Sequence, residues 1–123
     1  MENEAILRHL LPEEIFKYFD LVTIDETQTN NLNLHLDEKK CPPPEHSDKP
    51  LVSYGFDGPI KIQDFPLRQK SVYLVVRRRR WKDKETGKIY SRSWDLSATG
   101  TSYSKEFAAF LKGLFRQIPD KFQ

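Results

Sequence analysis

The stretch "SVYLVVRRRRWKDKETGKIYSRSW" (Ser71–Trp94) decides the fold that this 123-residue chain can adopt. Its first part, residues 71–81, is rich in β-branched and aromatic residues and predicts a β-strand. The segment "KDKETGK" (82–88) predicts a turn, in which Gly87 can supply a positive φ. Residues 88–96 then alternate as a partner strand. We therefore predict a β-hairpin as the defining element of the fold.

Four consecutive arginines end the first strand of this hairpin. Side chains alternate along a strand, so Arg77 and Arg79 point to one face and Arg78 and Arg80 to the other. A strand that carries charge on both faces cannot be buried on both sides. We therefore expect the end of the hairpin to project beyond the core as a two-stranded ribbon.

A ribbon of this composition suits a nucleic acid. The planar guanidinium of arginine binds phosphate through two hydrogen bonds and stacks on flat rings. A two-stranded ribbon can enter the DNA major groove or lie along the backbone, and aromatic residues beside arginine can stack on unpaired bases. The candidate contacts are ten residues of the hairpin: Arg77, Arg78, Arg79, Arg80, Trp81, Lys82, Lys84, Lys88, Tyr90 and Arg92. Of the aromatic residues, Trp81, Tyr90 and Trp94 either pack the ribbon or touch bases. A solvated edge, or an edge that binds an acidic protein, is the alternative.

The charge of the chain is unevenly distributed, although its net charge is only +2. Residues 1–40 contain nine acidic and four basic residues, whereas residues 68–92 contain ten basic and two acidic residues. Such asymmetry favours contact of one region with a polyanion. Two solvated faces that attract each other are the alternative interpretation.

The rest of the sequence predicts short elements around the hairpin, in a single α+β domain of residues 1–123. Apolar residues at helical spacing predict two short N-terminal helices and a C-terminal helix: Ala5–Leu11, Pro12–Phe19 and Tyr103–Ile118. Three further strands are predicted: Leu21–Asp25 and Asn31–Glu38, which pair as a hairpin, and Ile60–Pro66. The prediction is therefore a sheet of about five antiparallel strands. The C-terminal helix can be capped by Thr101 or Ser102.

The segment "CPPPEHSDKPLVSYGFDGP" (Cys41–Pro59) shows no periodicity and is rich in proline and glycine. It predicts a long, partly extended loop. A loop of this length is uncommon in a compact domain unless it is functional or mobile. It divides the domain into an acidic helix-hairpin part (1–40) and a basic part with the hairpin and the C-terminal helix (60–118).

The sequence disfavours several classes of protein. No apolar run approaches the roughly 20 residues that span a bilayer, and the N-terminus lacks the basic region of a secretory signal, so we expect a cytoplasmic protein without membrane contact. The single cysteine, Cys41, allows no internal disulfide and no four-cysteine zinc site. No glycine-rich phosphate loop or nucleophile elbow is present, so we expect no enzyme and assign no catalytic residue or cofactor. Asp64 is interpreted as a strand-end hydrogen-bonding residue, and a metal-dependent nuclease that uses it is the enzymatic alternative.

The stretch "IQDFPLRQKSVYLVVRRRRW" (Ile62–Trp81) resembles the N-terminal region of certain bacterial insertion-sequence transposases. In that family a strand ends in an Asp-hydrophobe-Pro step, matched by Asp64–Pro66, and a valine- and arginine-rich strand follows, matched by Arg77–Arg80. The resemblance extends from Leu32 to Leu111. With the stretch "YSRSWDLSATGTSYSKEFAAFL" (90–111) included, it is more similar still to a subgroup that carries this region as its own short reading frame, as the N-terminal part of a split or frame-shifted transposase.

The resemblance implies a zinc ribbon with two cysteine knuckles, but this sequence departs from that pattern. Cys41 stands where the first knuckle begins, whereas Pro44 stands in place of its second cysteine, and "WKDKETGK" (81–88) replaces the second knuckle. We therefore expect a metal-free, zinc-ribbon-like fold without bound zinc. Trp81 and Tyr90 are expected to fill space near the lost knuckle.

The resemblance also implies a function. It implies a DNA-binding domain or subunit of a transposase, whose partner is double-stranded DNA at the ends of the element. The catalytic nuclease domain of the family lies outside these residues. The alternative is a protein-interaction module, whose acidic helices or C-terminal helix dock a separately encoded catalytic subunit. The sequence leaves the DNA sequence and the oligomeric state open.

Overall fold

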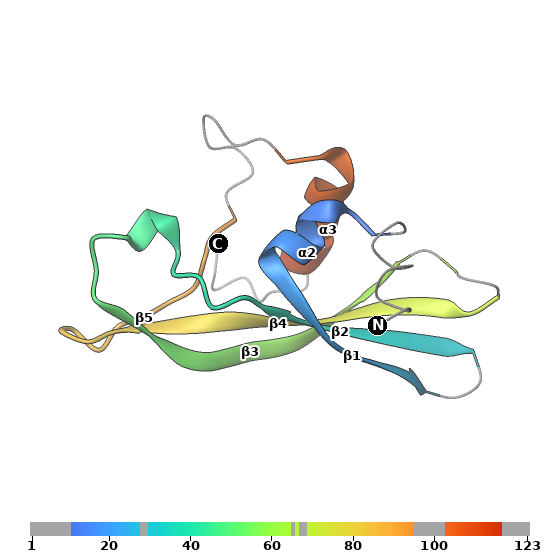
Figure 1. Cartoon of the computed structure of the whole chain (residues 1–123), viewed down its shortest axis with the longest axis horizontal. Helices are drawn as coiled ribbons and strands as arrows, with labels where there is room; N and C mark the ends of the chain where they lie inside the picture. The colour runs from blue at the N-terminus through green and yellow to red at the C-terminus, as the bar shows by residue number, and fades with distance from the viewer. Residues whose placement is uncertain (1–10, 28–29, 65, 67–68, 95–102, 117–123) are drawn as a thin grey trace.

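The computed structural model describes residues 11–27, 30–64, 66, 69–94 and 103–116. These residues form two helices packed on one sheet, so the predicted α+β class is confirmed (Figure 1). Along the chain the elements are α2 (Glu13–Tyr18), β1 (Phe19–Thr27), β2 (Asn31–Glu38), the short 3-10 helix η1 (Pro44–His46), β3 (Leu51–Gln63), β4 (Ser71–Asp83), β5 (Ile89–Tyr90) and α3 (Lys105–Arg116). The helix predicted over Ala5–Leu11 lies, except for Leu11, outside the described residues.

The sheet has the strand order β1-β2-β4-β3, and the short β5 pairs with β4. β1 and β2 form the predicted antiparallel hairpin, and β3 and β5 are also antiparallel to β4. However, β2 and β4 run parallel, from Asn31 opposite Ser71 to Asp37 opposite Arg77. The prediction of an entirely antiparallel sheet is therefore wrong for this pair. The reason is that the chain reverses twice between β2 and β4, while β3 lies on the far side of β4.

The long loop predicted over residues 41–59 is wrong in its second half, because β3 begins at Leu51. Glycine and proline concealed this strand. Gly55 and Gly58 adopt φ values of +79° and +106°, and the pairing of β3 with β4 shifts register at both places. Bulges and a proline such as Pro59 are tolerated here because β3 is an edge strand and its outer side needs no hydrogen-bond partner.

The strand predicted over residues 88–96 is shorter than expected, because only Ile89–Tyr90 pairs with β4. The chain then leaves the sheet. The backbone N–H of Ser93 donates to the carboxylate of Glu45 at 2.7 Å, and Trp94 adopts a left-handed φ of +53°. The side chain of Trp94 enters the core and is 2% exposed. The last two residues of the predicted strand lie outside the described part of the chain.

Both α2 and α3 lie on the same face of the sheet, and the core lies between them and the strands (Figure 1). The ring of Trp94 contacts those of Tyr18, Phe19 and Phe107, with centroids 4.9, 5.8 and 6.0 Å away. Aliphatic and aromatic side chains fill the rest: Leu11, Ile15, Phe16, Leu34, Leu36, Val72, Leu74, Val76, Phe110, Leu111 and Leu114. The apolar stripe of the C-terminal helix is thus core.

The start of α3 is fixed by Ser104. Its hydroxyl accepts a hydrogen bond from the N–H of Phe107 at 3.1 Å, which is an N-cap contact. The carboxylate of Glu14 in α2 accepts the N–H and the hydroxyl of Ser104 at 2.7 and 2.8 Å. The bond from the backbone N–H holds the pKa of Glu14 below its ordinary value. The predicted caps, Thr101 and Ser102, lie outside the described residues.

Candidate nucleic-acid interface

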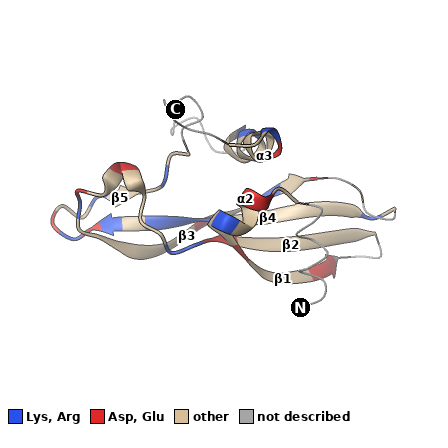
Figure 2. Cartoon of the chain, turned by 45° about the horizontal axis from the view of Figure 1, so that its top comes forward, with Lys and Arg blue, Asp and Glu red and all other residues tan. Residues whose placement is uncertain are grey.

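Beyond the helices the sheet continues as a narrower part that we call the ribbon (Figure 1). It consists of Leu51–Asp57 of β3, Arg78–Asp83 of β4 and Ile89–Tyr90 of β5. Because β3 pairs with one edge of β4, β5 takes the other edge, which β2 leaves after Asp37. The ribbon is therefore three strands wide at the level of Lys82, not two as expected. Lysine and arginine follow β4 along it (Figure 2).

Burial changes sides along β4. In the half that the helices cover, the even-numbered side chains Val72, Leu74 and Val76 are buried, and so is Arg78 where the ribbon begins. Further along, the odd-numbered Trp81 and Asp83 are buried instead. The end of this strand is therefore not buried on both sides, but Arg78 is buried although it belongs to the run of arginines. Each half of β4 has one covered face and one open face.

The covered face of the ribbon lies beside the loop that joins β2 to β3. In this loop the side chain of Pro43 is fully buried, and the ring of His46 lies 4.4 Å from that of Tyr90. The ammonium of Lys49 lies 5.5 Å from the same tyrosine ring. Tyr90 is the cross-strand neighbour of Trp81, which is 2% exposed. Trp81 therefore packs the ribbon and presents no surface to a ligand.

Two of the consecutive arginines bind acidic residues at the end of β2. Arg77 donates two hydrogen bonds to the carboxylate of Asp37, at 2.7 and 2.6 Å. The side chain of Arg79 donates to the backbone carbonyl of Glu38 at 3.2 Å. Both guanidinium groups also lie over the ring of Phe56, 4.3 and 4.5 Å from its centroid. These arginines stabilise the junction between the covered half of the sheet and the ribbon.

Arg78 is only 6% exposed. It donates to the backbone carbonyl of Arg92 at 2.9 Å and lies 5.5 Å from the ring of Phe115. The buried carboxylate of Glu38 accepts the backbone N–H of Arg79 at 3.0 Å. Burial raises the pKa of Glu38, while that hydrogen bond and the nearby arginine charges oppose the rise. Arg78 therefore makes its contacts inside the protein and is not accessible to a nucleic acid.

Arg92 lies beside the aromatic core, with its guanidinium carbon 4.0 Å from the ring of Trp94 and 4.8 Å from that of Tyr18.

The tip of the ribbon has the predicted turn. Gly87 adopts φ +78°, and the Asp83 carboxylate accepts the backbone N–H of Glu85 and Thr86. Lys84 and Lys88 are exposed in this turn.

The open face of the ribbon carries what we call the ribbon patch: Val52, Tyr54, Arg80, Lys82 and Ile89. Val52, Lys82 and Ile89 lie side by side across β3, β4 and β5. Tyr54 is 44% exposed, and the charged groups of Arg80 and Lys82 each lie 5.3 Å from the centroid of its ring. Val52 and Ile89 are 39% and 45% exposed. The patch therefore combines exposed apolar side chains, one ring and two cations.

The positive charge at this end of the ribbon is only partly compensated. The Nε of Arg80 lies 3.7 Å from the carboxylate of Asp57, and 36% of the arginine side chain is exposed. Lys82, Lys84 and Lys88 form no ion pair with any residue that the structure describes. The structure thus brings Arg80, Lys82, Lys84 and Lys88 to one end of the molecule, and separates Arg78 and Trp81 from them by burial.

Sequence reasoning missed Val52 and Tyr54. The alternation "LVSY" (51–54) carries a signal for them, because it sets Val52 and Tyr54 on the face opposite Leu51 and Ser53. The two glycines and the proline that follow hid this signal. Without the strand, nothing in the sequence places Tyr54 beside the basic residues of β4.

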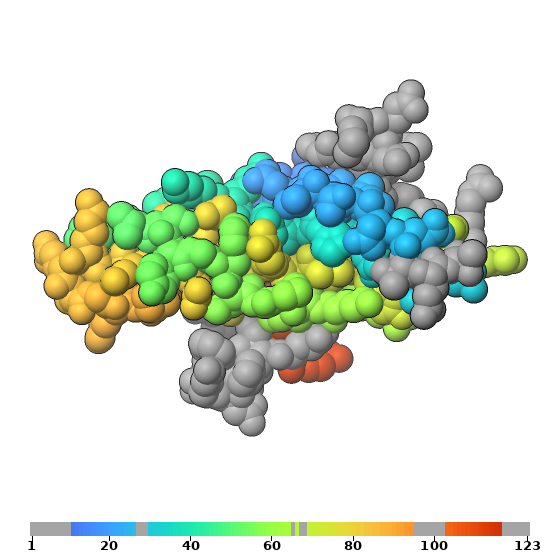
Figure 3. Space-filling view, turned by 90° about the horizontal axis from the view of Figure 1, so that it is seen from below, coloured from blue at the N-terminus to red at the C-terminus, as the bar shows by residue number. Residues whose placement is uncertain are grey.

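The helix-free face of the sheet is shallowly hollowed between β1 and β3 (Figure 3). This hollow of about 250 Å³ is lined by Val22, Thr23, His35, Asp37, Pro59, Val75 and Arg77. Its polar side chains have partners within the protein: Arg77 pairs with Asp37, and the His35 ring nitrogen lies 2.5 Å from the Asp25 carboxylate. The hollow is therefore less suited to bind an anion than the ribbon, where three lysines have no ion-pair partner among the described residues.

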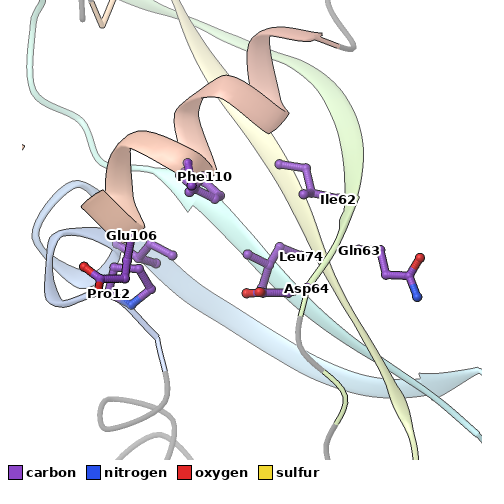
Figure 4. A pocket seen from close by; sticks show the side chains of 9 residues that line it. Pro12, Ile62, Gln63, Asp64, Leu74, Glu106 and Phe110 are labelled. Carbon is purple, nitrogen blue, oxygen red and sulfur yellow. The ribbon is translucent and has the colours of Figure 1, made fainter. Parts of the chain in front are cut away.

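A groove of about 380 Å³ lies between α2, α3 and the end of β3 (Figure 4). Apolar side chains dominate its lining, which comprises Pro12, Ile15, Ile62, Gln63, Asp64, Leu74, Glu106, Ala109 and Phe110. Glu106 and Pro12 lie on one side of the groove, and Ile62 and Gln63 on the other (Figure 4). The backbone N–H of Asp64 donates to Val72 at 2.8 Å, next to the end of β3. The groove is therefore mainly apolar, with acidic side chains in its lining.

Among the described residues, no group of three or more histidine, cysteine, aspartate or glutamate side chains is arranged to hold a metal ion. Cys41 is exposed and unpaired. None of the helices in the described ranges is long and apolar enough to cross a membrane. In comparisons with protein-family models, curated proteins and solved structures, no match to this chain was found.

Proposed function

We propose that this chain binds double-stranded DNA as the N-terminal domain or subunit of a transposase, at the ends of the mobile element and in the cytoplasm. The observation that carries the proposal is the cluster of Arg80, Lys82, Lys84 and Lys88 at the end of the ribbon, in which the three lysines have no ion-pair partner among the described residues. A cation without an ion-pair partner in the protein can contact a DNA phosphate without first breaking an ion pair. Each such contact releases counterions of the DNA, which favours binding.

The ribbon is better suited to the DNA backbone than to a groove. At the level of Lys82 three strands lie side by side, and strands are about 4.8 Å apart, so their backbones span about 10 Å before side chains are added. The loop with His46 packs against the covered face. The major groove is only about 12 Å wide and accommodates two strands. In this proposal the four cations contact phosphates, and the chain itself performs no catalysis.

The test is DNA affinity across a salt series. We compare the Lys82→Ala/Lys88→Ala variant with a matched variant, Lys105→Ala/Lys112→Ala, which removes two exposed lysines from α3. Log affinity falls as log salt concentration rises, and each lost phosphate contact makes this slope shallower by about 0.9. The slope of the ribbon variant should therefore be shallower than that of the wild type by about 1.8. Fluorescence anisotropy with a labelled duplex gives both slopes. Equal slopes for the two variants, or no binding by the wild type, would overturn the proposal.

The groove between α2 and α3 favours a second candidate, a protein-interaction module that docks a separately encoded catalytic subunit. Its apolar lining with Ile15, Ile62 and Phe110 suits an apolar segment of a partner protein. Co-expression of the chain with a neighbouring catalytic reading frame tests this. The candidate is supported if the two co-purify and if Ala109→Arg, which adds a large charged side chain to the lining, abolishes the complex without unfolding the chain.

A further inference from the structure

The ribbon patch differs from a surface built for phosphates alone. A surface that binds only phosphates needs cations. In this patch, however, three of the five side chains are exposed and apolar or aromatic: Val52, Tyr54 and Ile89. In a duplex the faces of the bases are stacked inside, and only their edges reach the grooves. Bases in a single strand are free to place a face on a protein ring. The composition of the patch therefore matches unpaired nucleotides.

The arrangement of the patch supports the same conclusion. Tyr54 is 44% exposed on the open face of the ribbon. Arg80 and Lys82 lie over the ring, with their charged groups 5.3 Å from its centroid, so cations lie close to any base that stacks on the exposed part of the ring. Val52 and Ile89 flank Lys82 on the adjacent strands and offer apolar contacts to sugars. An aromatic ring with cations around it is the arrangement by which proteins bind single strands with little sequence preference.

We propose that the ribbon patch binds unpaired nucleotides of DNA, with Tyr54 as the stacking residue and Arg80 and Lys82 as the phosphate contacts on either side. This inference rests on the proposed DNA binding and specifies its substrate: a single-stranded stretch, such as the one exposed when the end of a duplex opens. Duplex phosphates next to that stretch are then held by Lys84 and Lys88 in the turn.

The experiment measures binding of three labelled DNAs by fluorescence anisotropy: a duplex, the same duplex with a single-stranded extension, and a single strand of about 20 nucleotides, which exceeds the usual site size of one single-strand-binding fold. The wild type should bind the extended duplex and the single strand more tightly than the blunt duplex. Tyr54→Leu should weaken binding to both by about tenfold, because one base loses its stacking partner. Binding of the blunt duplex should change by less than about twofold.

Two further variants and a folding check serve as controls. Tyr54→Phe retains the ring and should restore single-strand binding. Tyr73→Leu replaces a half-buried tyrosine of β4 outside the ribbon, where the ammonium of Lys61 lies over the ring, 4.5 Å from its centroid, and should leave all three affinities unchanged. Thermal melts confirm that each variant is folded.

The possible failures are distinguishable. Tight binding of the blunt duplex with no effect of Tyr54→Leu on any DNA would overturn this inference and leave the proposed function standing. Equal weakening of all three DNAs by Tyr54→Leu would also overturn it, because stacking on an unpaired base would then not be the cause. Failure of the wild type to bind any of the three would overturn both.

Discussion

The two halves of the sheet share the strand β4 but differ in what covers them. In the helix-covered half, Val72, Leu74 and Val76 of β4 are at most 1% exposed. In the ribbon, Val52 and Tyr54 of the neighbouring β3 are 39% and 44% exposed. Buried apolar area is the main source of folding free energy. One half therefore stabilises the protein, while the other displays cations and a ring that contribute little to stability.

The arginines at the boundary make contacts like those of the helix-covered half, although they carry the same positive charge as the residues displayed on the ribbon. Arg77 binds Asp37, Arg79 binds Glu38, and Arg78 is buried. A run of identical residues thus contains structural arginines, whereas Arg80 faces the open side. Position along β4, and not residue type, determines which role an arginine has.

The strongest way to break this comparison is to damage the covered half. Phe107 is fully buried and its ring contacts those of Trp94, Tyr18 and Phe110. Phe107→Ala should lower the free energy of unfolding by about 3–5 kcal/mol, because it leaves a cavity in the only core that the described residues share. Urea unfolding followed by tryptophan fluorescence measures the loss. A change below about 1 kcal/mol would show that the helices do not stabilise the sheet in this way.

A smaller effect is expected at Gly58, where β3 bends between the two halves. Its φ is +106°, and an added Cβ would lie 3.0 Å from the carbonyl oxygen of Val76 and 3.1 Å from the nitrogen of Ile60. Gly58→Ala should therefore cost about 2 kcal/mol or more. Gly87→Ala is the matched control: its φ is +78° but nothing lies within 4 Å of the new Cβ, so about 1 kcal/mol is expected. Equal losses in urea unfolding would contradict the role of the close contact.

A pH-dependent effect is expected between the two helices. The N–H of Ser104 lowers the pKa of Glu14, so the contribution of this carboxylate is fully present above its unfolded pKa and is lost as the pH falls through the lower folded value. Glu14→Gln should lower the free energy of unfolding by about 1 kcal/mol at pH 7, since the group is partly solvated. The deficit should narrow below about pH 4. Glu13→Gln, which removes the charge of an exposed neighbour in α2, is the control for the loss of one negative charge.

The sequence could predict a feature when the residues that determine it are close together along the chain. The strand from Ser71 and the turn with the positive φ of Gly87 follow from adjacent residues, and both are confirmed. The burial of Arg78 depends on α3 and on Arg92, which reach it only after folding. The pairing of Arg77 with Asp37 depends on β2 lying parallel to β4, a register between segments 40 residues apart. Alternation alone could place the arginines on two faces, but it could not show which face another element covers.

The smallest effect on stability is expected at the ribbon patch, and it sharpens the comparison most. Lys82 forms no ion pair with any described residue, and its ammonium lies 5.3 Å from the centroid of the Tyr54 ring. Lys82→Ala should therefore change the free energy of unfolding by less than about 0.5 kcal/mol, as is usual for surface residues. The same variant should weaken DNA binding and make it less dependent on salt. If it destabilised the protein as much as Gly58→Ala, the ribbon would be part of the stabilising half, and its cations would be structural like Arg77.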